Sequence, residues 1–198
     1  MCKFANTAYN SGFYPHISIL ANLHIMNVLE LFKKITTFVF DVDGVLTDGT
    51  VLVLPNGVQA RQMHIKDGFG LQMAVKNGFK VIIISGGTSE PVIDRLHKLG
   101  IREVHMTVSD KKQFLETWMK KNGLKWDEML YMADDLPDLE VMKYCGVSAC
   151  PADAVMEVRE VADYISPVNG GFGCVRDVIE KVLKVQDKWN YATDVVSK

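Results

Sequence analysis

Asp41 and Asp43 follow directly on the apolar run from Ile35 to Phe40 and are separated by one residue. Two carboxylates at this spacing repel each other, and a site that keeps both ionised needs a cation, a shared proton or full solvation to offset the repulsion. Side chains alternate along a strand, so we expect both carboxylates to point to the same side. The pair therefore predicts a carboxylate site that works with a metal ion.

Ser85, Gly86, Gly87 and Lys111 follow later apolar runs of the chain. The Ser85 hydroxyl can bind a phosphoryl oxygen, and the two glycines allow backbone N–H groups to approach closely. Lys111 can neutralise negative charge that a nucleophile shares with a phosphoryl group. These residue types together indicate a site for a phosphate ester.

Asp134 follows a further apolar run and begins an acidic cluster with Asp135 and Asp138. Asp134, with Asp135 or Asp138 behind it, can complete an all-oxygen site that suits Mg²⁺. On a phosphate ester, Asp41 can attack phosphorus to form an aspartyl-phosphate, while Asp43 protonates the leaving group and later deprotonates the attacking water. We therefore predict metal-assisted phosphoryl transfer.

The elements that position these residues are apolar runs of strand length alternating with segments of helical period. Strands are predicted at 37–40, 81–84, 104–106, 129–132 and 147–149, and helices at 70–77, 90–99, 111–122, 137–144 and 175–185. The alternation predicts an α/β fold, a Rossmann-like parallel sheet sandwiched by helices. Each motif alone is typical of a turn, a helix cap or a surface lysine. All of them follow strand ends, where such sheets bind ligands, and this favours one shared crevice.

A β-hairpin insert is predicted at residues 50–64. Its arms, 50–54 and 59–64, flank Pro55-Asn56-Gly57-Val58, and Asn-Gly is a strong hairpin turn signal. The first arm is apolar at every position from Val51 to Leu54, so both of its faces need cover. A lone two-stranded hairpin is marginal in water. A neighbouring subunit is the simplest cover, and we predict a homo-oligomer built partly through this hairpin.

Four motifs of the chain resemble those of the haloacid dehalogenase (HAD) superfamily of aspartyl-nucleophile phosphatases. The residues that carry the resemblance are Asp41-Val42-Asp43-Gly44-Val45-Leu46-Thr47-Asp48-Gly49, Ser85, Lys111 and Asp134-Asp135-Leu136-Pro137-Asp138. Within the superfamily the chain is most similar to the 3-deoxy-D-manno-octulosonate 8-phosphate phosphatases and related sugar-acid phosphatases. The hairpin, Lys66-Asp67-Gly68-Phe69-Gly70 and the segment 170–177 carry this closer similarity.

The resemblance implies a role for each motif residue. Asp41 is expected to be the nucleophile and a Mg²⁺ ligand, Asp43 the acid/base and a ligand through its backbone carbonyl, and Asp134 the third protein ligand. The implied activity is Mg²⁺-dependent hydrolysis of a sugar-acid phosphate, 3-deoxy-D-manno-octulosonate 8-phosphate, in lipopolysaccharide sugar biosynthesis. The implied assembly is a cytoplasmic homotetramer with a minimal cap.

Substrate contacts are expected from Lys66, Gly86, Gly87 and Arg176. The sequence supports equally a second role for Arg176, that of a surface cation at the start of the last helix. The apolar residues of that helix are predicted to belong to the core. Two positions depart from the family pattern. Ala133 stands where the fourth motif usually begins with Gly, and Gly87 stands where many relatives carry Arg, so a cation that helps to bind the sugar acid is missing.

Other functions fit parts of the pattern. A non-catalytic phosphatase-like module for oligomerisation or regulation would retain the fold, but it predicts degenerate motifs, whereas the motif carboxylates and Lys111 are all present. A phosphoacceptor receiver domain also uses acids and a lysine on a parallel sheet, and the later acidic pair fits it poorly. A phosphatase of a related nonulosonate 9-phosphate remains open, because the sequence does not identify the sugar acid.

Composition limits the remaining classes. The chain has 198 residues, a net charge of −2 and a pI near 6.2, so one domain is expected, without a basic surface for nucleic acid. Four cysteines form no zinc-binding spacing and are expected to be free thiols in a reducing cytoplasm. Residues 1–26 contain no signal peptide or membrane span and are predicted to be an extension, with the phosphatase domain at 27–198 and a natural start at Met26.

Overall fold

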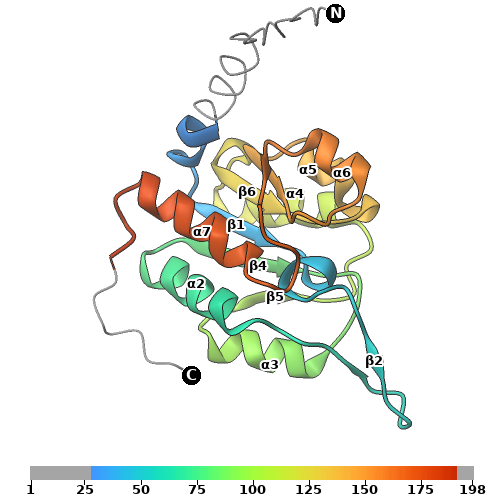
Figure 1. The fold of residues 1–198 in the computed structure, drawn as a ribbon. Helices are drawn as coiled ribbons and strands as arrows, with labels where there is room; N and C mark the ends of the chain where they lie inside the picture. Colours follow the sequence, from blue (N-terminus) through green and yellow to red (C-terminus); the bar gives the residue numbers. More distant parts are fainter. Residues whose placement is uncertain (1–27, 191–198) are drawn as a thin grey trace, which may run out of the picture.

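A six-stranded parallel sheet forms the centre of the computed structural model, which describes residues 28–190 (Figure 1). The strand order is β5-β4-β1-β6-β7-β8. The strands are β1 (Thr37–Phe40), β4 (Lys80–Ile84), β5 (Glu103–His105), β6 (Met129–Met132), β7 (Val147–Cys150) and β8 (Tyr164–Ile165). The chain adds strands on one side of β1 and then on the other, so the order reverses between β1 and β6. Such a switch point opens a crevice at the carboxyl ends of the strands.

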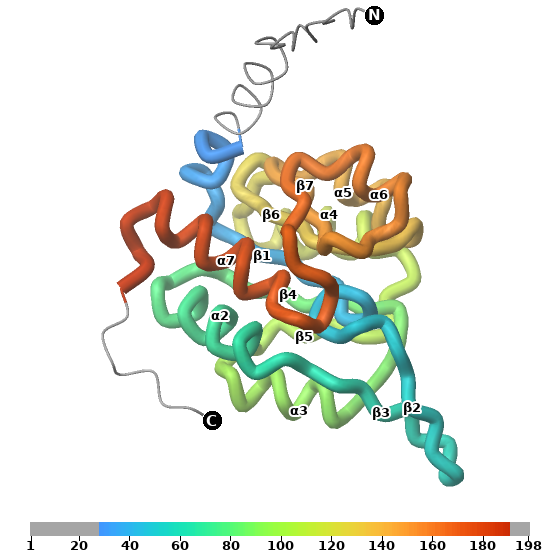
Figure 2. Tube along the Cα trace, viewed as in Figure 1, coloured from blue at the N-terminus to red at the C-terminus, as the bar shows by residue number. Residues whose placement is uncertain are grey.

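Helices cover both faces of the sheet, so the predicted α/β fold is confirmed. On one face lie α2 (Ile65–Lys76), α3 (Glu90–Lys98), α7 (Cys174–Val185) and a helical turn at 28–32. On the other lie α4 (Lys111–Asn122), α5 (Leu139–Met142) and α6 (Met156–Val161). Short irregular helical segments occur at η1 (Val42–Leu46), η2 (Trp126–Glu128) and η3 (Leu136–Asp138). Figure 2 follows the chain through these two layers.

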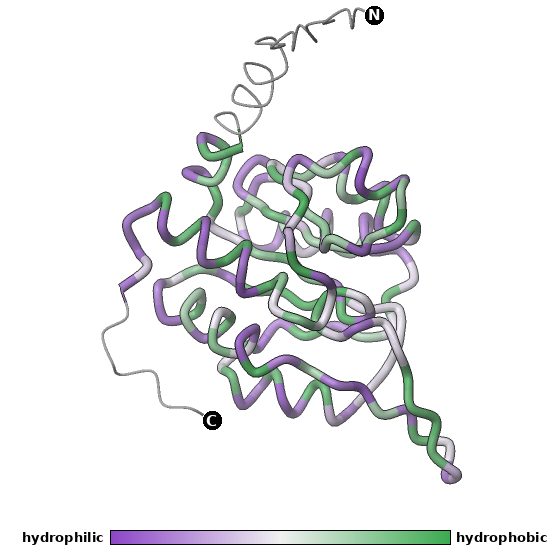
Figure 3. The backbone as a smooth tube through the Cα atoms, viewed as in Figure 1, coloured by the Kyte–Doolittle hydropathy of each residue, from purple (hydrophilic) through white to green (hydrophobic). Residues whose placement is uncertain are grey.

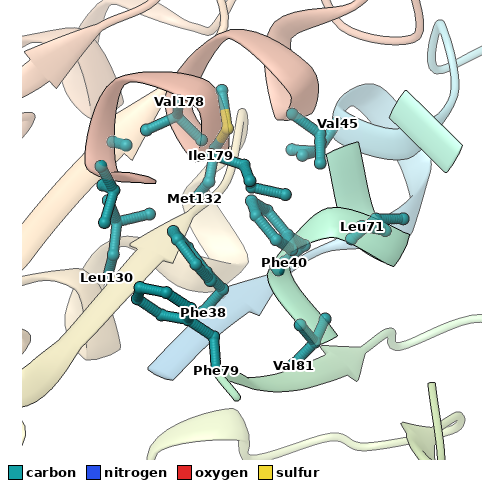
Figure 4. Packing of buried hydrophobic residues seen from close by; sticks show 14 of the residues in the cluster. Phe38, Phe40, Val45, Leu71, Phe79, Val81, Leu130, Met132, Val178 and Ile179 are labelled. Atoms are coloured by element: carbon teal, nitrogen blue, oxygen red, sulfur yellow. The ribbon is translucent and has the colours of Figure 1, made fainter. Parts of the chain in front are cut away.

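The two faces of the sheet have separate cores, because side chains alternate along each strand. In β1, Phe38 and Phe40 pack with α2 and α7, whereas Val39 packs with the helices of the opposite face. The two phenyl rings are stacked with centroids 5.9 Å apart (Figure 4). Every residue of β1 is buried, which explains why the strand reads as a continuous apolar run.

Two glycines in α2 show where local pattern and tertiary packing conflict. The helix begins at Ile65, earlier than the predicted start at 70, because Gly68 and Gly70 obscure the helical pattern. A Cβ at Gly70 would lie 3.1 Å from the Arg176 Cα, and one at Gly68 would lie 3.2 Å from an Arg95 nitrogen. The glycines therefore allow α2 to approach α7 and α3 closely.

The other predicted elements agree with the structure to within a few residues, and several short ones were not predicted. Strand 129–132 and helix 111–122 have the predicted bounds. Helix 137–144 is divided into η3 and α5. The pattern missed α6 and β8, and β8 pairs only along the edge of β7. A two-residue edge strand has too little periodicity for detection.

The predicted hairpin is present and projects from the body of the molecule (Figures 1 and 2). Its strands, β2 (Leu52–Val53) and β3 (Gln59–Ala60), are antiparallel and shorter than the predicted arms. Gly57 takes φ +78° in the turn, as the Asn-Gly signal requires. Leu52 and Val53 are 65% and 68% exposed, so this subunit alone does not bury them.

The remaining expectations concern the chain ends and the cysteines. The extension at 1–26 lies outside the described residues, and the domain division stays a prediction. Within 28–190, Cys145, Cys150 and Cys174 are free, and burial raises the pKa of each thiol. Among the helices of this same range, none has the length and apolar character needed to cross a bilayer.

Candidate active site

A pocket of about 290 Å³ lies at the carboxyl ends of β1, β4 and β6. All of its lining residues belong to the sequence motifs. They are Asp41, Asp43, Gly49, Ser85, Gly86, Gly87, Lys111, Asp134, Asp135, Pro137 and Asp138. The structure thus brings together the predicted catalytic and metal-binding side chains, which come from the segments after β1, β4 and β6 and from the start of α4.

The loop after β1 carries both acids of the first motif. The Asp41 N–H donates to the Met132 carbonyl at 3.1 Å, which extends the pairing of β1 with β6. The chain then leaves the strand, and Gly44 turns it at φ +85°. Strand alternation is therefore the wrong reason for the placement of Asp43, although both carboxylates line the same pocket.

Gly44 also makes room for the third acid. A Cβ at this position would lie 1.9 Å from Oδ2 of Asp134. The Asp134 carboxylate therefore sits directly against the bare backbone of the loop. A side chain at residue 44 would expel that carboxylate from the pocket, besides straining the backbone.

Lys111 lies on the floor of the pocket between two carboxylates. Its Nζ is 2.9 Å from Asp41 Oδ1 and 2.8 Å from Asp138 Oδ2. Tyr131 donates its hydroxyl to Asp138 Oδ1 in a short hydrogen bond, and this oxygen also lies 2.7 Å from the Lys111 Nζ. Lys111 is the first residue of α4, where the Asp110 cap accepts a hydrogen bond from the Gln113 N–H at 2.8 Å. The helix start thus fixes the root of this lysine.

The electrostatics of the floor follow from burial and pairing. Burial raises the pKa of Asp41 to about 6, against the opposing effect of Lys111. For Lys111, burial acts to lower the pKa, but Asp41 and Asp138 together hold it above its ordinary value. Lys111 is therefore charged at neutral pH, and it supplies positive charge next to Asp41 in a poorly solvated position.

Asp134 has the properties of a cation ligand. Its Oδ1 is buried and has no hydrogen-bond partner. Burial, and then the charge of Asp41, raise its pKa to about 7. A buried carboxylate oxygen without a donor, next to a second carboxylate, is a position that a cation would stabilise.

The other two acids of the fourth motif have different partners. Asp138 is held by Lys111 and Tyr131. Asp135 is exposed, and its Oδ1 accepts from the Leu136 N–H at 2.8 Å. Asp135 or Asp138 was expected as a further metal ligand behind Asp134. Neither side chain is needed if the backbone carbonyl of Asp43 is a ligand. In residues 28–190 no three acidic, His or Cys side chains form a metal-binding group by themselves. Two carboxylates and one carbonyl agree with that finding and fit Mg²⁺, which keeps water and phosphate ligands.

Ser85 is buried at the end of β4. Its Oγ accepts from the Gly87 N–H at 3.0 Å, and its backbone N–H donates to the His105 carbonyl at 2.9 Å. Because the hydroxyl oxygen already accepts, its hydrogen can be donated towards the pocket. The geometry suits a donor to a phosphoryl oxygen.

Arg61 contacts Asp43 from the hairpin side. Its Nε is 2.6 Å from Asp43 Oδ1, and its Nη2 is 3.0 Å from Oδ2. This planar, two-point pairing is the strong form of the Arg–carboxylate interaction, and Asp43 raises the pKa of Arg61 in turn. The sequence pattern did not single out Arg61, since it lies 18 residues from its partner on a different element.

The late glycine segment braces the first motif. A Cβ at Gly170 would lie 1.8 Å from the Gly44 carbonyl oxygen, and one at Gly171 would lie 2.3 Å from the Asp48 nitrogen. The Gly171 N–H donates to the Val45 carbonyl at 2.9 Å. These glycines therefore hold the loop of the first motif in place by close backbone packing.

Comparison with known proteins identifies the family. No family model matches the chain. The 3-deoxy-D-manno-octulosonate 8-phosphate phosphatase KdsC of Escherichia coli K12 is 32% identical over 166 residues, 84% of this chain and 88% of that protein. The protein of the same name from Yersinia pestis is 30% identical over 189 residues, 96% and 97% of the two chains. This chain belongs to that phosphatase family.

Solved structures support the same family assignment. A HAD-superfamily (subfamily III A) hydrolase from Legionella pneumophila superposes with a TM-score of 0.83 at 34% identity, covering 86% of this chain and 93% of its own. The 3-deoxy-D-manno-octulosonate 8-phosphate phosphatase of Moraxella catarrhalis, in complex with magnesium, phosphate and KDO, gives 0.81 at 34% identity, with 83% and 94% covered. The predicted superfamily and enzyme class are confirmed.

Two residues expected at the substrate, Lys66 and Arg176, are not among those that line the pocket in this subunit, and their role stays a prediction. Lys66 is exposed at the start of α2. The Arg176 guanidinium lies 4.8 Å from the ring centroids of both Phe69 and Trp189, and its Nε is 2.9 Å from Glu180. Of the two readings of Arg176, its contacts within this subunit support the structural one. Gly86 and Gly87 do line the pocket.

Ala133 departs from the family pattern without consequence for the backbone. It is fully buried, and it is not among the residues with positive φ, which outside glycine are Thr107 and Asp187 within residues 28–190. Alanine therefore fits this position at no conformational cost.

Proposed function

We propose that the chain is a Mg²⁺-dependent phosphomonoester hydrolase that cleaves 3-deoxy-D-manno-octulosonate 8-phosphate through an aspartyl-phosphate. The observation that carries the proposal is the pocket floor, where charged Lys111 contacts Asp41 beside the unpaired buried oxygen of Asp134. The ligands of the Moraxella catarrhalis relative support the choice of metal and sugar acid. This activity belongs to lipopolysaccharide sugar biosynthesis.

In the first step an Asp41 oxygen attacks phosphorus as the bond from phosphorus to the sugar oxygen breaks. Lys111, 2.9 Å from Asp41, offsets the charge that the nucleophile and the phosphoryl oxygens share. Ser85 donates its hydroxyl hydrogen to a phosphoryl oxygen. Asp43 gives a proton to the leaving sugar oxygen, which departs as the alcohol.

In the second step water attacks phosphorus, and Asp43 takes the proton of that water. The bond from phosphorus to Asp41 breaks, which releases phosphate and restores the carboxylate. Splitting the displacement in two lets one acid serve as nucleophile and the other as proton carrier. Their partners differ accordingly: Asp41 is paired with a lysine in the floor, whereas Asp43 lies 35% exposed at the mouth.

Mg²⁺ would be held by the carboxylates of Asp41 and Asp134 and by the Asp43 backbone carbonyl. When bound, it supplies positive charge that draws the phosphate and the nucleophile together. The fit depends on oxygen donors alone and on the Asp134 oxygen that lacks a donor.

A phosphate-release assay tests the proposal. We expect the purified chain to hydrolyse 3-deoxy-D-manno-octulosonate 8-phosphate with Mg²⁺ and to lose activity with EDTA, in a panel that includes a nonulosonate 9-phosphate and common hexose phosphates. Preference for the nine-carbon ester would correct the substrate and keep the chemistry. Inertness towards the whole panel with Mg²⁺ present would favour the non-catalytic module.

We further propose a homotetramer assembled through the hairpin. Its apolar residues, Val51, Leu52, Val53, Leu54 and Val58, are all exposed and form a continuous apolar arm (Figure 3). Exposed apolar surface of this kind marks an association site. Multi-angle light scattering at micromolar concentration should give the mass of four subunits. Leu52→Asp should reduce the number of subunits per particle. Met156→Asp, at a position that is also strongly exposed, should leave that number unchanged. A monomeric wild type would exclude this assembly.

A further inference from the structure

Arg61 connects the hairpin to the pocket through its pair with Asp43. Its side chain is only 6% exposed, although it follows directly on β3 of the projecting hairpin. Nη1 donates to the Gln59 carbonyl at 3.3 Å, so the guanidinium is held by its own strand as well as by Asp43. Burying an arginine side chain costs conformational entropy and solvation free energy. The two hydrogen-bonding partners of Arg61 offset part of this cost and hold its guanidinium in one position.

Gly87 provides the space for this guanidinium. A Cβ at Gly87 would lie 3.4 Å from Arg61 Nη2 and 3.5 Å from Asp43 Oδ2. One methyl group would fit, but a longer side chain would enter the volume that Arg61 occupies. The loop of Ser85 to Gly87 carries no cation of its own, and Arg61 brings one to this position from another element.

We propose that Arg61 is the positioning residue for Asp43 in the proton-transfer steps. The inference rests on the proposed hydrolysis and deepens it. The two contacts, Nε with Oδ1 at 2.6 Å and Nη2 with Oδ2, together fix the carboxyl plane. The longer contact with Oδ2, at 3.0 Å, is the one that yields, so that Oδ2, next to Gly87, carries the proton.

In both steps the proton leaves and returns to Asp43 alone, and the protonation state of Arg61 does not change. As the bond from phosphorus to the alkyl oxygen breaks and the bond from phosphorus to Asp41 forms, the proton on Oδ2 passes to the alkyl oxygen. Attack by water returns a proton to Oδ2. Arg61 neither gains nor loses a proton, and its contribution is the orientation of Oδ2.

Leaving-group dependence separates this role from a purely structural one. An alkyl alkoxide needs a proton to depart, whereas p-nitrophenolate does not. The values of kcat/KM report only the steps up to release of the alcohol, so later hydrolysis does not mask the difference. For Arg61→Ala we expect kcat/KM to fall about 100-fold on the alkyl phosphate that the wild type hydrolyses best, and less than about fivefold on p-nitrophenyl phosphate.

Two further measurements guard against a folding effect. Arg61→Lys, which retains a charge but not the two-point pairing, should fall between wild type and Arg61→Ala on the alkyl ester. Guanidinium chloride at non-denaturing concentration should restore part of the alkyl-ester rate of Arg61→Ala. Arg102→Ala, at an exposed arginine just before β5, is the matched control and should change neither rate.

If Arg61→Ala is active and its kcat/KM falls equally on both esters, or falls on neither, the positioning role is overturned. The proposed hydrolysis would remain intact in both cases. If Arg61→Ala does not fold, the same comparison of the two esters is made with Arg61→Lys. It then decides between a positioning role and a purely structural role of Arg61. A wild type inert towards both esters with Mg²⁺ would remove the proposed function and this inference together.

Discussion

The two sides of the pocket are built differently. The floor is a buried chain of contacts from Asp41 through Lys111 to Asp138 and Tyr131, made by residues of β6, of the segments that follow β1 and β6, and of the start of α4. The hairpin side is a single pair, Arg61 with Asp43, in which the acid is one-third exposed. The floor is supported by the central sheet, whereas the other side depends on a two-stranded hairpin.

The difference matches the roles that we propose for the two acids. A nucleophile must be held at one distance from phosphorus and next to compensating charge, and a largely buried floor supported by the sheet provides both. A proton carrier must exchange with a leaving group and with water, so it needs a wetter position and a partner that can yield. We therefore expect changes in the floor to affect both stability and chemistry, and changes on the hairpin side to affect chemistry mainly.

The largest expected effect comes from Asp41→Asn. An amide cannot act as the nucleophile, so turnover should fall by more than about 1,000-fold while the circular dichroism spectrum stays native. The control is Asp94→Asn, an exposed acid on α3, which should keep wild-type turnover. Retained hydrolysis in Asp41→Asn would show that another group attacks phosphorus.

Lys111→Met tests whether the floor combines stability with chemistry. The change leaves two carboxylates without their shared cation, so phosphate release should fall about 100-fold or more, and unfolding in urea should show a loss of about 3–5 kcal/mol. Lys120→Met, an exposed position on the same helix, should cost far less. An unchanged urea midpoint in Lys111→Met would mean that the buried network adds no net stability.

A pair of glycine substitutions compares the backbone packing behind the first motif with the hairpin turn. Gly170→Ala places a methyl group against the Gly44 carbonyl and should destabilise the fold by about 3 kcal/mol and slow turnover. Gly57→Ala meets no atom within 4 Å and strains only the hairpin turn at φ +78°, so about 1 kcal/mol is expected, with chemistry retained. Thermal unfolding and phosphate release measure both, and a larger loss from Gly57→Ala would reverse the comparison.

The smallest effect is a pH dependence of Mg²⁺ binding. Without metal, the pKa values of Asp41 and Asp134 are raised to about 6 and about 7, so protons occupy the carboxylates as the pH falls through this range. Mg²⁺ must displace those protons, and its affinity should fall by up to about tenfold per pH unit for each proton displaced below pH 7. Calorimetric titrations at pH 8 and pH 6 in buffers of different ionisation enthalpy measure affinity and proton release. Equal affinity at both pH values would contradict the raised pKa values.

The sequence predicted the fold well where the signal is local. Strand β1 lies in the middle of the sheet and is buried on both faces, so its apolar run has one structural meaning. Helix α4 has its Asp110 cap and Gly123 at the C-cap with φ +65°, and both ends were therefore predictable. The early start of α2 was missed because its glycines satisfy distant contacts with α7 and α3.

For the candidate site, spacing in the chain located the motifs but not the contacts among them. The run of buried strands followed by polar residues is enough to place Asp41, Ser85 and Asp134 along one edge, because parallel strands end on the same side of a sheet. Assigning Lys111 a partner required three dimensions, since it lies 70 residues from Asp41.

By itself, the sequence determined the fold class and the family, since these depend on local periodicity and on motifs of adjacent residues, and the same motifs predicted the reacting groups. Only the tertiary structure decided that Asp138 supports Lys111, that Gly170 braces the first motif and that Arg61 faces Asp43. The physical reason is that such contacts join segments far apart in the chain. Their energies depend on distance and burial in the folded molecule, and neither quantity exists until the sheet and its helices have packed.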